Sequence, residues 1–325
     1  MTKTVGIFDQ TIERLKERLA TLEGDFRIVP YTADGKYLVD GESKSPEEID
    51  LDYLWLSPDL SLNGVIAPTF EMALKTRSIG VLQTFNAGLD HPVYAKIAEK
   101  GTRLCNSSAQ AVAISEYLMA YALSSYHPLQ ERQQAQAQLE WKRTPFRELS
   151  GTKWVIFGFG PIGRNIAKRA KAFDADISVI RRSSEGSPDV SRVGGLKDAK
   201  SFMADADIVV LACSLNETTR GMADKSFFEA IKPGALLINI ARGRLIDDAA
   251  LIDALDQGIL SKAVLDVFHT EPLPTDDPLW SHPKVELTAH TSFNGSGVRQ
   301  RWDDLFFDTL PRYLRGEALP NEVAS

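Results

Sequence analysis

Residues 154–183, WVIFGFGPIGRNIAKRAKAFDADISVIRRS, predict a strand, a glycine-rich turn, a helix and a second strand in that order. The apolar run Trp154–Phe157 suits a buried parallel strand. Gly158, Gly160 and Gly163 follow it in GxGxxG spacing, which allows a tight turn, the approach of a pyrophosphate and close packing of the helix. Because the N-terminus of such a helix favours an anion, we interpret the stretch as a dinucleotide-binding unit. A glycine-rich turn in another kind of α/β unit is the alternative.

The end of the second strand, Ile177–Ile180, is followed by Arg181, Arg182 and Ser183. A site for NAD usually carries Asp or Glu about 20 residues after the glycines, where it binds the ribose 2′-hydroxyl. Guanidinium and hydroxyl groups at this place suit a 2′-phosphate instead. We therefore predict NADP(H) as the cofactor, with NAD(H) as the alternative; a solvated basic pair is the structural alternative. The predicted cofactor site also includes the residues between the glycines, Phe159, Pro161 and Ile162.

The chain has 325 residues, 43% of them hydrophobic, which is enough for two domains with sizeable cores. Its net charge of −7 argues against nucleic acid or an anionic membrane as the main partner. Cys105 and Cys213 lie far apart in apolar surroundings and suit reduced core residues of a cytoplasmic protein. The N-terminus lacks the apolar core of a signal peptide, and no apolar run is long enough to span a membrane.

Residues 1–104 alternate short apolar strands with amphipathic helices, the pattern of a parallel α/β domain. The predicted strands are Thr4–Phe8, Phe26–Pro30, Tyr53–Leu56, Gly64–Ala67, Gly80–Thr84 and Arg103–Cys105. The predicted helices are Gln10–Ala20, Phe70–Thr76 and Pro92–Lys100. Residues 32–50 are polar and turn-rich, so we expect a surface loop there.

The apolar stretch Ser107–Ser125 predicts a long helix that ends before His127-Pro128. A helix of this kind must be covered by the other domain or by a second subunit. Residues 128–150 are polar and Gln-rich around an isolated Trp141, which predicts an arm that contacts a partner chain. We therefore expect a homodimer.

The chain beyond Trp154 continues the α/β alternation to its end. The predicted strands are Ile208–Ala212, Leu236–Asn239, Ala263–Val267 and Val285–Leu287. The predicted helices are Lys197–Met203, Ala223–Ala230, Asp247–Gln257 and Val298–Leu314.

Arg242, Glu271 and His290 each lie at or just beyond the end of a predicted strand, where ligands bind in open α/β sheets. Arginine offers a planar fork for a carboxylate, and histidine exchanges a proton near neutral pH. A carboxylate bonded to the other ring nitrogen holds the tautomer of the histidine. These are the groups needed for hydride transfer to a 2-keto acid. Taken singly, each could instead be structural: a surface charge, a turn cap or a hydrogen-bonded histidine.

Several motifs together resemble the D-isomer-specific 2-hydroxyacid dehydrogenases, especially the glyoxylate/hydroxypyruvate reductase branch. The matching stretches are NAGLD at 86–90, GFGPIGRNIAKRAKAFDADISVI at 158–180, INIARGRLID at 238–247, AVLDVFHTEPLP at 263–274, LTAHTS at 287–292 and RYLRGEALPNEV at 312–323. They cover most of the chain from about residue 80 onward, in the order of the family.

The resemblance implies two doubly wound parallel-sheet domains, with a Rossmann-type cofactor domain, 105–290, inserted into a flavodoxin-like substrate domain, 1–104 and 291–325. It implies that Arg242 binds the substrate carboxylate and carbonyl, that His290 is the acid–base group and that Glu271 is its partner. The backbone at Ala87 and Gly88 would receive the substrate carboxylate. The implied cofactor contacts, besides the glycine-rich turn and the 181–183 segment, are Cys213, Ala241, Arg242, Asp266 and His290. No metal is implied, and the helix at 107–125 with the arm would form a dimer interface.

The expected activity is therefore the NADPH-preferring reduction of a small 2-keto acid, glyoxylate or hydroxypyruvate. Two other activities stay open at this point. One is a dehydrogenase of a bulkier D-2-hydroxy acid, and the other is a non-catalytic dinucleotide-sensing protein of the corepressor kind. The expected partner is a small-molecule 2-keto acid, with no nucleic acid and no membrane.

Overall fold

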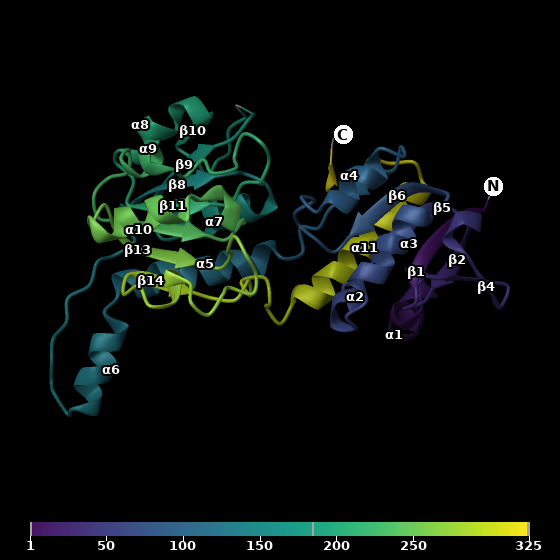
Figure 1. Ribbon diagram of the computed structural model, residues 1–325, viewed down its shortest axis with the longest axis horizontal. Helices are drawn as coiled ribbons and strands as arrows, with labels where there is room; N and C mark the ends of the chain where they lie inside the picture. The colour runs from purple at the N-terminus through teal and green to yellow at the C-terminus, as the bar shows by residue number, and fades with distance from the viewer. Residues whose placement is uncertain (1, 184, 324–325) are drawn as a thin grey trace. The chain divides into compact units, whose positions relative to one another are not determined.

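A computed structural model describes residues 2–183 and 185–323 (Figure 1). The chain divides into two compact units. Unit 1 runs up to Gln110 and resumes at Ser296, and unit 2 is Ala111–Gly295. The sequence predicts that the chain passes from one domain to the other a few residues earlier, at 104/105 and 290/291. The later positions have a physical reason, because Ser107 N and Gln110 Nε2 donate to carbonyls of unit 1, whereas Thr291 N and Ser292 N donate to Asp266 of unit 2.

The sheet of unit 1 has the strand order β15-β7-β6-β5-β1-β2-β3-β4. The strands that run parallel are β1 (Lys3–Phe8), β2 (Phe26–Tyr31), β5 (Asp50–Leu56), β6 (Ser78–Thr84) and β7 (Arg103–Cys105). Counted along the chain, their order is 2-1-3-4-5, which is the flavodoxin-like order. The edges are antiparallel, so the sheet is mixed: they are formed by β3 (Tyr37–Val39), β4 (Glu42–Lys44) and β15 (Glu322–Val323).

Helices cover both faces of this sheet. On one face, α1 (Asp9–Leu19) and α11 (Val298–Leu314) bury Leu15 and Phe306, and the Phe306 ring stacks on Trp55 with 3.9 Å between ring centroids. On the other face, α3 (Ile66–Lys75) and α4 (Pro92–Ala98) bury Met72 and Tyr94. The remaining short helices of the unit are α2 (Asp59–Leu62) and the 3₁₀ turn Pro46–Glu48.

Two predictions for unit 1 are wrong. Residues 32–50 do not form a loop, because Tyr37 is fully buried and anchors the β3–β4 hairpin to the sheet edge. Gly64–Ala67 is not a strand. Gly64 has φ +68° and turns the chain from α2 into α3, and Pro68 occupies the first turn of α3, where its missing N–H costs nothing.

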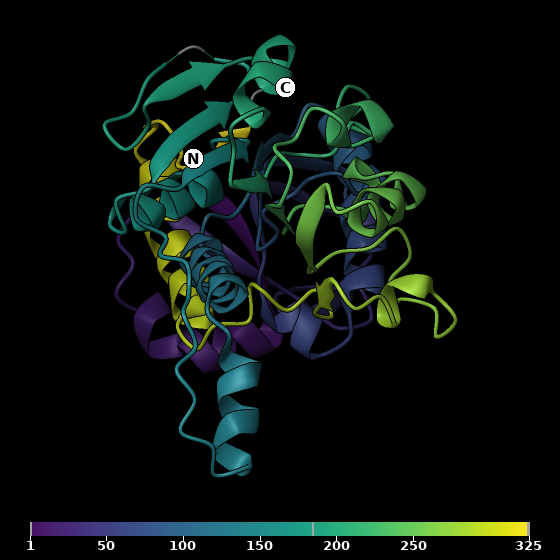
Figure 2. The same cartoon turned by 90° about the vertical axis from the view of Figure 1, so that its left-hand side faces the viewer.

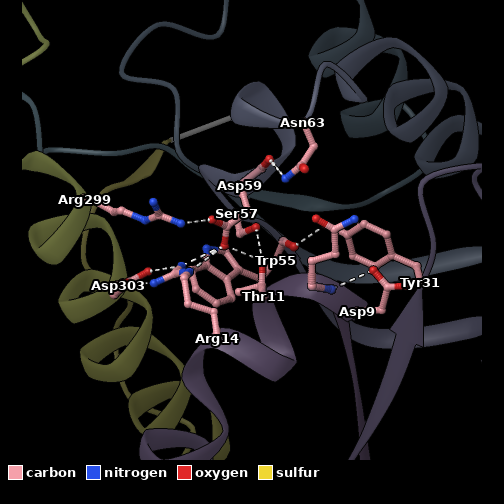
Figure 3. Close-up of polar contacts among 11 residues, drawn as sticks. Asp9, Thr11, Arg14, Tyr31, Trp55, Ser57, Asp59, Asn63, Arg299 and Asp303 are labelled. Carbon is pink, nitrogen blue, oxygen red and sulfur yellow. Dashed lines mark hydrogen bonds and ion pairs between the residues drawn. The ribbon is translucent and has the colours of Figure 1, made fainter.

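Figure 3 shows a polar network at the carboxyl ends of β1 and β5. The buried carboxylate of Asp59, which follows β5, accepts hydrogen bonds from Thr11 Oγ1 at 2.7 Å, Arg14 Nη2 at 2.8 Å and Arg299. Arg14 also pairs with Asp303 at 2.6 Å. The network joins α1, the turn after β5 and the first turns of α11, so it fixes this turn within unit 1.

The sheet of unit 2 is parallel throughout, in the order β10-β9-β8-β11-β12-β13-β14. Its strands are β8 (Lys153–Phe157), β9 (Asp176–Ile180), β10 (Arg192–Gly194), β11 (Ile208–Leu211), β12 (Ala235–Asn239), β13 (Leu260–Leu265) and β14 (Val285–Leu287). Counted along the chain, the order is the Rossmann 3-2-1-4-5-6 with one further strand at the edge. The prediction of two doubly wound α/β domains is confirmed, with the antiparallel edges of unit 1 as the addition.

The helices of unit 2 also cover both faces of its sheet. On one face lie α5 (Ala111–Tyr126) and α7 (Pro161–Lys171), with Leu118 and Ile166 in the core. On the other lie α8 (Ala199–Met203), α9 (Lys225–Phe228) and α10 (Asp248–Asp256). The 3₁₀ turns are Leu196–Asp198, Gly243–Leu245 and Pro278–Trp280. The apolar helix α5 thus finds part of its cover within its own unit.

The arm predicted at 128–150 contains α6 (Leu129–Ala137). Figures 1 and 2 both show α6 extending away from the sheet of unit 2. Leu139 is 95% exposed and Trp141 is 96% exposed, so these two apolar side chains have almost no cover among the described residues.

Candidate functional site

The glycine-rich turn joins β8 to the N-terminus of α7. A Cβ at Gly158, which has φ +96°, would lie 2.6 Å from the carbonyl oxygen of Ala212, and one at Gly163 would lie 2.2 Å from that of Gly158. A Cβ at Gly160 would meet nothing within 4 Å. The first and third glycines therefore let backbone segments touch, while the second leaves open space at the start of the helix. That space and the amide groups beside it fit the pyrophosphate of a dinucleotide.

Cationic side chains gather around Phe159, the second residue of this turn. The guanidinium carbons of Arg164 and Arg181 lie 5.0 and 5.5 Å from the centre of the Phe159 ring. Arg181 follows β9, and its side chain is only 15% exposed. Sequence reasoning missed Arg164, although its place in the first turns of α7 could have indicated it.

The segment after β9 folds back on Arg181. Arg181 Nη1 donates to the carbonyl oxygen of Glu185 at 3.2 Å, and Nη2 lies 3.9 Å from the Glu185 carboxylate. Arg182 and Ser183 are exposed. Sequence reasoning also missed Glu185. Its carboxylate competes for the Arg181 guanidinium with any anion that binds beside Arg181.

The turn after β12 holds Ala241 and Arg242. The buried side chain of Asn239 shapes it, accepting from Ala241 N at 3.1 Å and donating to the Arg242 carbonyl oxygen at 2.9 Å. Arg242 Nη1 donates to the Ala241 carbonyl oxygen at 2.6 Å. Gly243 packs against the turn after β13, because a Cβ there would lie 2.0 Å from the carbonyl carbon of Phe268. The turn with Arg242 and the turn that leads to Glu271 are therefore in direct contact.

His290 and Glu271 form a hydrogen bond of 2.7 Å between Nδ1 and Oε2. The other carboxylate oxygen of Glu271 accepts from Phe268 N at 2.9 Å, which holds the carboxylate in place. A carboxylate only accepts, so Nδ1 carries the proton of this bond and Nε2 is the nitrogen that can exchange a proton with a substrate. The side chains are 41% and 37% exposed, as a ligand would require.

Asp266 follows β13 and is fully buried. Its carboxylate accepts from the Thr288 hydroxyl at 2.6 Å and from the amides of Thr291 and Ser292 at 2.8 and 3.0 Å. These donors flank His290. In this structure the carboxylate therefore holds the histidine turn, and its predicted contact with the cofactor stays a prediction.

Cys213 follows β11, and its Cα lies against Gly158, so its backbone borders the glycine-rich turn. Burial raises the pKa of its thiol to about 11, which keeps it protonated at neutral pH. Ala87 and Gly88 belong to unit 1, where they follow β6 and are half-buried. Asn106 Nδ2 donates to the Ala87 carbonyl oxygen at 2.7 Å. Their predicted role toward the substrate stays a prediction.

The predicted site residues of unit 2 thus cluster at the carboxyl ends of its strands, the edge at which doubly wound folds bind ligands. Over residues 2–183 and 185–323, no three His, Cys, Asp or Glu side chains are grouped in a way that could hold a metal ion. In the same part of the chain, no helix is long and apolar enough to cross a membrane.

Comparison with known proteins identifies the family of this chain. The sequence model described as "D-isomer specific 2-hydroxyacid dehydrogenase, NAD binding domain" matches residues 119–292. The chain is 30% identical, over 231 residues, to a protein of Serratia proteamaculans named glyoxylate/hydroxypyruvate reductase A, covering 69% of this chain and 74% of the relative.

Solved structures show the same fold. A D-isomer specific 2-hydroxyacid dehydrogenase family protein of Aeromonas salmonicida is 27% identical and has a TM-score of 0.76, covering 100% of this chain and 99% of the other. A family member of Xanthobacter autotrophicus, solved in complex with NADPH and MES, is 23% identical with a TM-score of 0.78, covering 100% and 98% of the two chains.

Proposed function

The chain belongs to the D-isomer-specific 2-hydroxyacid dehydrogenase family and is an NAD(P)-dependent oxidoreductase, and on that premise we propose that it reduces glyoxylate or hydroxypyruvate with NADPH as the preferred cofactor. The His290–Glu271 hydrogen bond, next to the turn of Arg242, is the observation that carries the proposal. The name of the Serratia relative supports a small 2-keto acid as the substrate.

His290 is the proposed acid–base group. When bound, NADPH supplies a hydride to the keto carbon of the substrate. In the direction of reduction, protonated His290 gives its Nε2 proton to the oxygen that gains charge, while Nδ1 keeps its hydrogen bond to Glu271. Because Glu271 is itself held by Phe268 N, the imidazole keeps one orientation through the proton transfer.

Arg242 is the proposed clamp for the carboxylate and carbonyl of the substrate. Its planar fork gives bidentate contacts that a lysine could not reproduce. From the resemblance we also propose that the backbone at Ala87 and Gly88 binds the substrate carboxylate.

The cofactor preference is proposed from Arg181, supported by Arg182 and Ser183. An aspartate at position 181 would bond the ribose hydroxyls and repel a 2′-phosphate, whereas the guanidinium attracts the phosphate. Cys213, Ala241 and Asp266 are the further proposed cofactor contacts, through backbone or side chain.

We further propose a cytoplasmic homodimer. The exposed Leu139 and Trp141 support a second copy as their cover, because isolated apolar side chains at a projecting arm lose their contact with water only in an interface. Cys105 and Cys213 are both free thiols, as a reducing compartment requires.

A turnover assay over a panel of 2-keto acids, each with NADPH and with NADH, tests the proposal. We expect the highest kcat/KM with glyoxylate or hydroxypyruvate and NADPH. A bulkier 2-keto acid as the best substrate would replace the proposed one, and no turnover together with tight dinucleotide binding would indicate a sensing protein.

A further inference from the structure

His290 has an unfavourable backbone conformation that the surrounding residues must maintain. Its φ is +47°, in the left-handed region that non-glycine residues rarely adopt. Such a conformation persists only where hydrogen bonds specify it. Here the amide of His290 donates to the Asp266 carbonyl oxygen at 2.8 Å, and the next two amides donate to the Asp266 carboxylate. Asp266 therefore defines the turn that carries the imidazole.

The Asp266 carboxylate is in turn bound by a short chain of hydroxyl groups. Thr288 Oγ1 lies 2.6 Å from Asp266 Oδ1, and Tyr117 Oη, from α5, lies 2.7 Å from Thr288 Oγ1. The direction of this chain follows from its chemistry. A carboxylate only accepts, so the single hydroxyl proton of Thr288 goes to Asp266, and Thr288 must accept from Tyr117. Burial raises the pKa of Tyr117, so the phenol keeps the proton that this arrangement needs.

We propose that Tyr117 and Thr288 are positioning residues for His290, which they hold in its reactive orientation through the buried carboxylate of Asp266. The inference rests on the proposed function, because it assigns these hydroxyls to the acid–base group of the proposed reaction. The physical reason is that a buried carboxylate needs its full set of donors. If the Thr288 donor is lost or free to rotate, Asp266 must turn toward other donors and releases the amides of Thr291 and Ser292.

The structure makes Tyr117 more than a packing residue. Its ring packs against Tyr121, with 4.5 Å between ring centroids, and that contact would survive replacement by phenylalanine. Only the hydroxyl reaches Thr288. A role in packing alone therefore predicts no effect of removing the oxygen, whereas the positioning role predicts a lower kcat at saturating cofactor.

Tyr117→Phe and Thr288→Val are the test substitutions. For Tyr117→Phe we expect kcat to fall about threefold to tenfold, the size expected for one ordinary hydrogen bond. The KM for the keto acid should stay within about twofold, because neither hydroxyl is proposed to touch the substrate. We compare kcat at saturating NADPH, because Asp266, which the two hydroxyls hold, is itself a proposed cofactor contact. Thr288→Val should lower kcat at least about tenfold, because it leaves the buried carboxylate short of a donor. Thr288→Ser restores the hydroxyl and should recover most of the rate.

Tyr126→Phe is the matched control. It removes the same atom from the same helix, where the hydroxyl of Tyr126 donates to the Asp207 carbonyl oxygen at 3.4 Å and not to the Thr288–Asp266 pair. We expect wild-type kinetics. Wild-type kcat in Tyr117→Phe, an equal loss in Tyr126→Phe, or no rescue by Thr288→Ser would each overturn the proposal.

A measurement without turnover separates this inference from the proposed function. Nitrogen-15 NMR of the histidine side chains, at a pH where they are neutral, reports the tautomer of His290, whose signal is assigned by its loss in His290→Ala. Wild type should show the proton on Nδ1, and Tyr117→Phe and Thr288→Val should show a smaller share of that tautomer. If wild type reduces no 2-keto acid, the proposed function fails. The positioning inference then fails only if the tautomer is also unchanged in both variants.

Discussion

Gly243→Ala should disable the site although Gly243 contacts no proposed ligand. The new Cβ would lie 2.0 Å from the carbonyl carbon of Phe268, 2.4 Å from its oxygen and 2.5 Å from His269 N. All three are backbone atoms, so no side chain can rotate to make room. Because non-bonded carbon atoms pack at about 3.5–4.0 Å, the two turns must separate by roughly 1.5 Å.

That displacement acts on the chemistry through Phe268, whose amide holds the Glu271 carboxylate that orients His290. A misplacement of about 1 Å in a catalytic group can cost about 100-fold, so we expect kcat/KM for the best 2-keto acid to fall at least that much. Overpacking of this size typically costs about 1–3 kcal/mol, which leaves a domain of ordinary stability folded.

The assay compares steady-state kinetics and the Tm of Gly243→Ala with those of Gly195→Ala. Gly195 is the control, because its Cβ would meet only Asp198 Oδ2 at 3.9 Å, an ordinary contact. We expect Gly195→Ala to resemble wild type. If Gly243→Ala kept kcat/KM within about threefold of wild type, the contact between the two turns would not position the site, and the reasoning would be refuted.

Four further predictions follow from the proposed roles. His290→Ala should fold and bind cofactor but reduce the keto acid at least ~100-fold more slowly, and near-wild-type turnover across neutral pH would contradict its role. Arg242→Lys keeps the charge and loses the planar fork, so KM should rise and kcat fall; a change in cofactor affinity alone would instead assign Arg242 to the phosphate site. Arg181→Asp should weaken NADPH use by roughly tenfold to a hundredfold and leave NADH use equal or better, and in wild type the NADPH preference should shrink with added salt. Light scattering should show a homodimer at micromolar concentration, and Trp141→Ala should weaken it; a wild-type monomer would exclude the proposed assembly.

Local pattern predicted much of the fold. The bounds of Arg103–Cys105, Val285–Leu287 and Val298–Leu314 were predicted as the structure has them, because each is an apolar or amphipathic run closed by turn residues. The errors lie where local pattern and tertiary context differ. The apolar residues of Gly64–Ala67 suit a strand, yet the segment forms the turn before α3 and the first two residues of that helix. The hairpin at 37–44 joins an apolar strand, Tyr37–Val39, to a polar one, Glu42–Lys44, and it belongs to the sheet through the pairing of Tyr37 with Tyr31 of β2.

The candidate site likewise contains residues that the sequence indicated and residues that it did not. Position after a strand indicated Arg242, Glu271 and His290, because parallel strands bring their carboxyl ends to one edge. The residues that hold them were not predictable from that rule. Asn239 is the fully buried last residue of β12 and shapes the turn through its side chain, Thr288 and Tyr117 are separated by 171 residues, and Gly243 matters only because another turn approaches it.

The sequence by itself determined the class of fold, the glycine-rich turn, the cationic segment after β9 and the set of side chains proposed to react, since each depends on residue type and short-range spacing. Only the tertiary structure decided which atoms meet: the Nδ1–Oε2 bond of His290 and Glu271, the burial of Asp266 and the hydroxyl chain from Tyr117. The physical reason is that hydrogen bonds act over about 3 Å and depend on angle. A spacing in sequence fixes neither quantity until the strands and helices have packed.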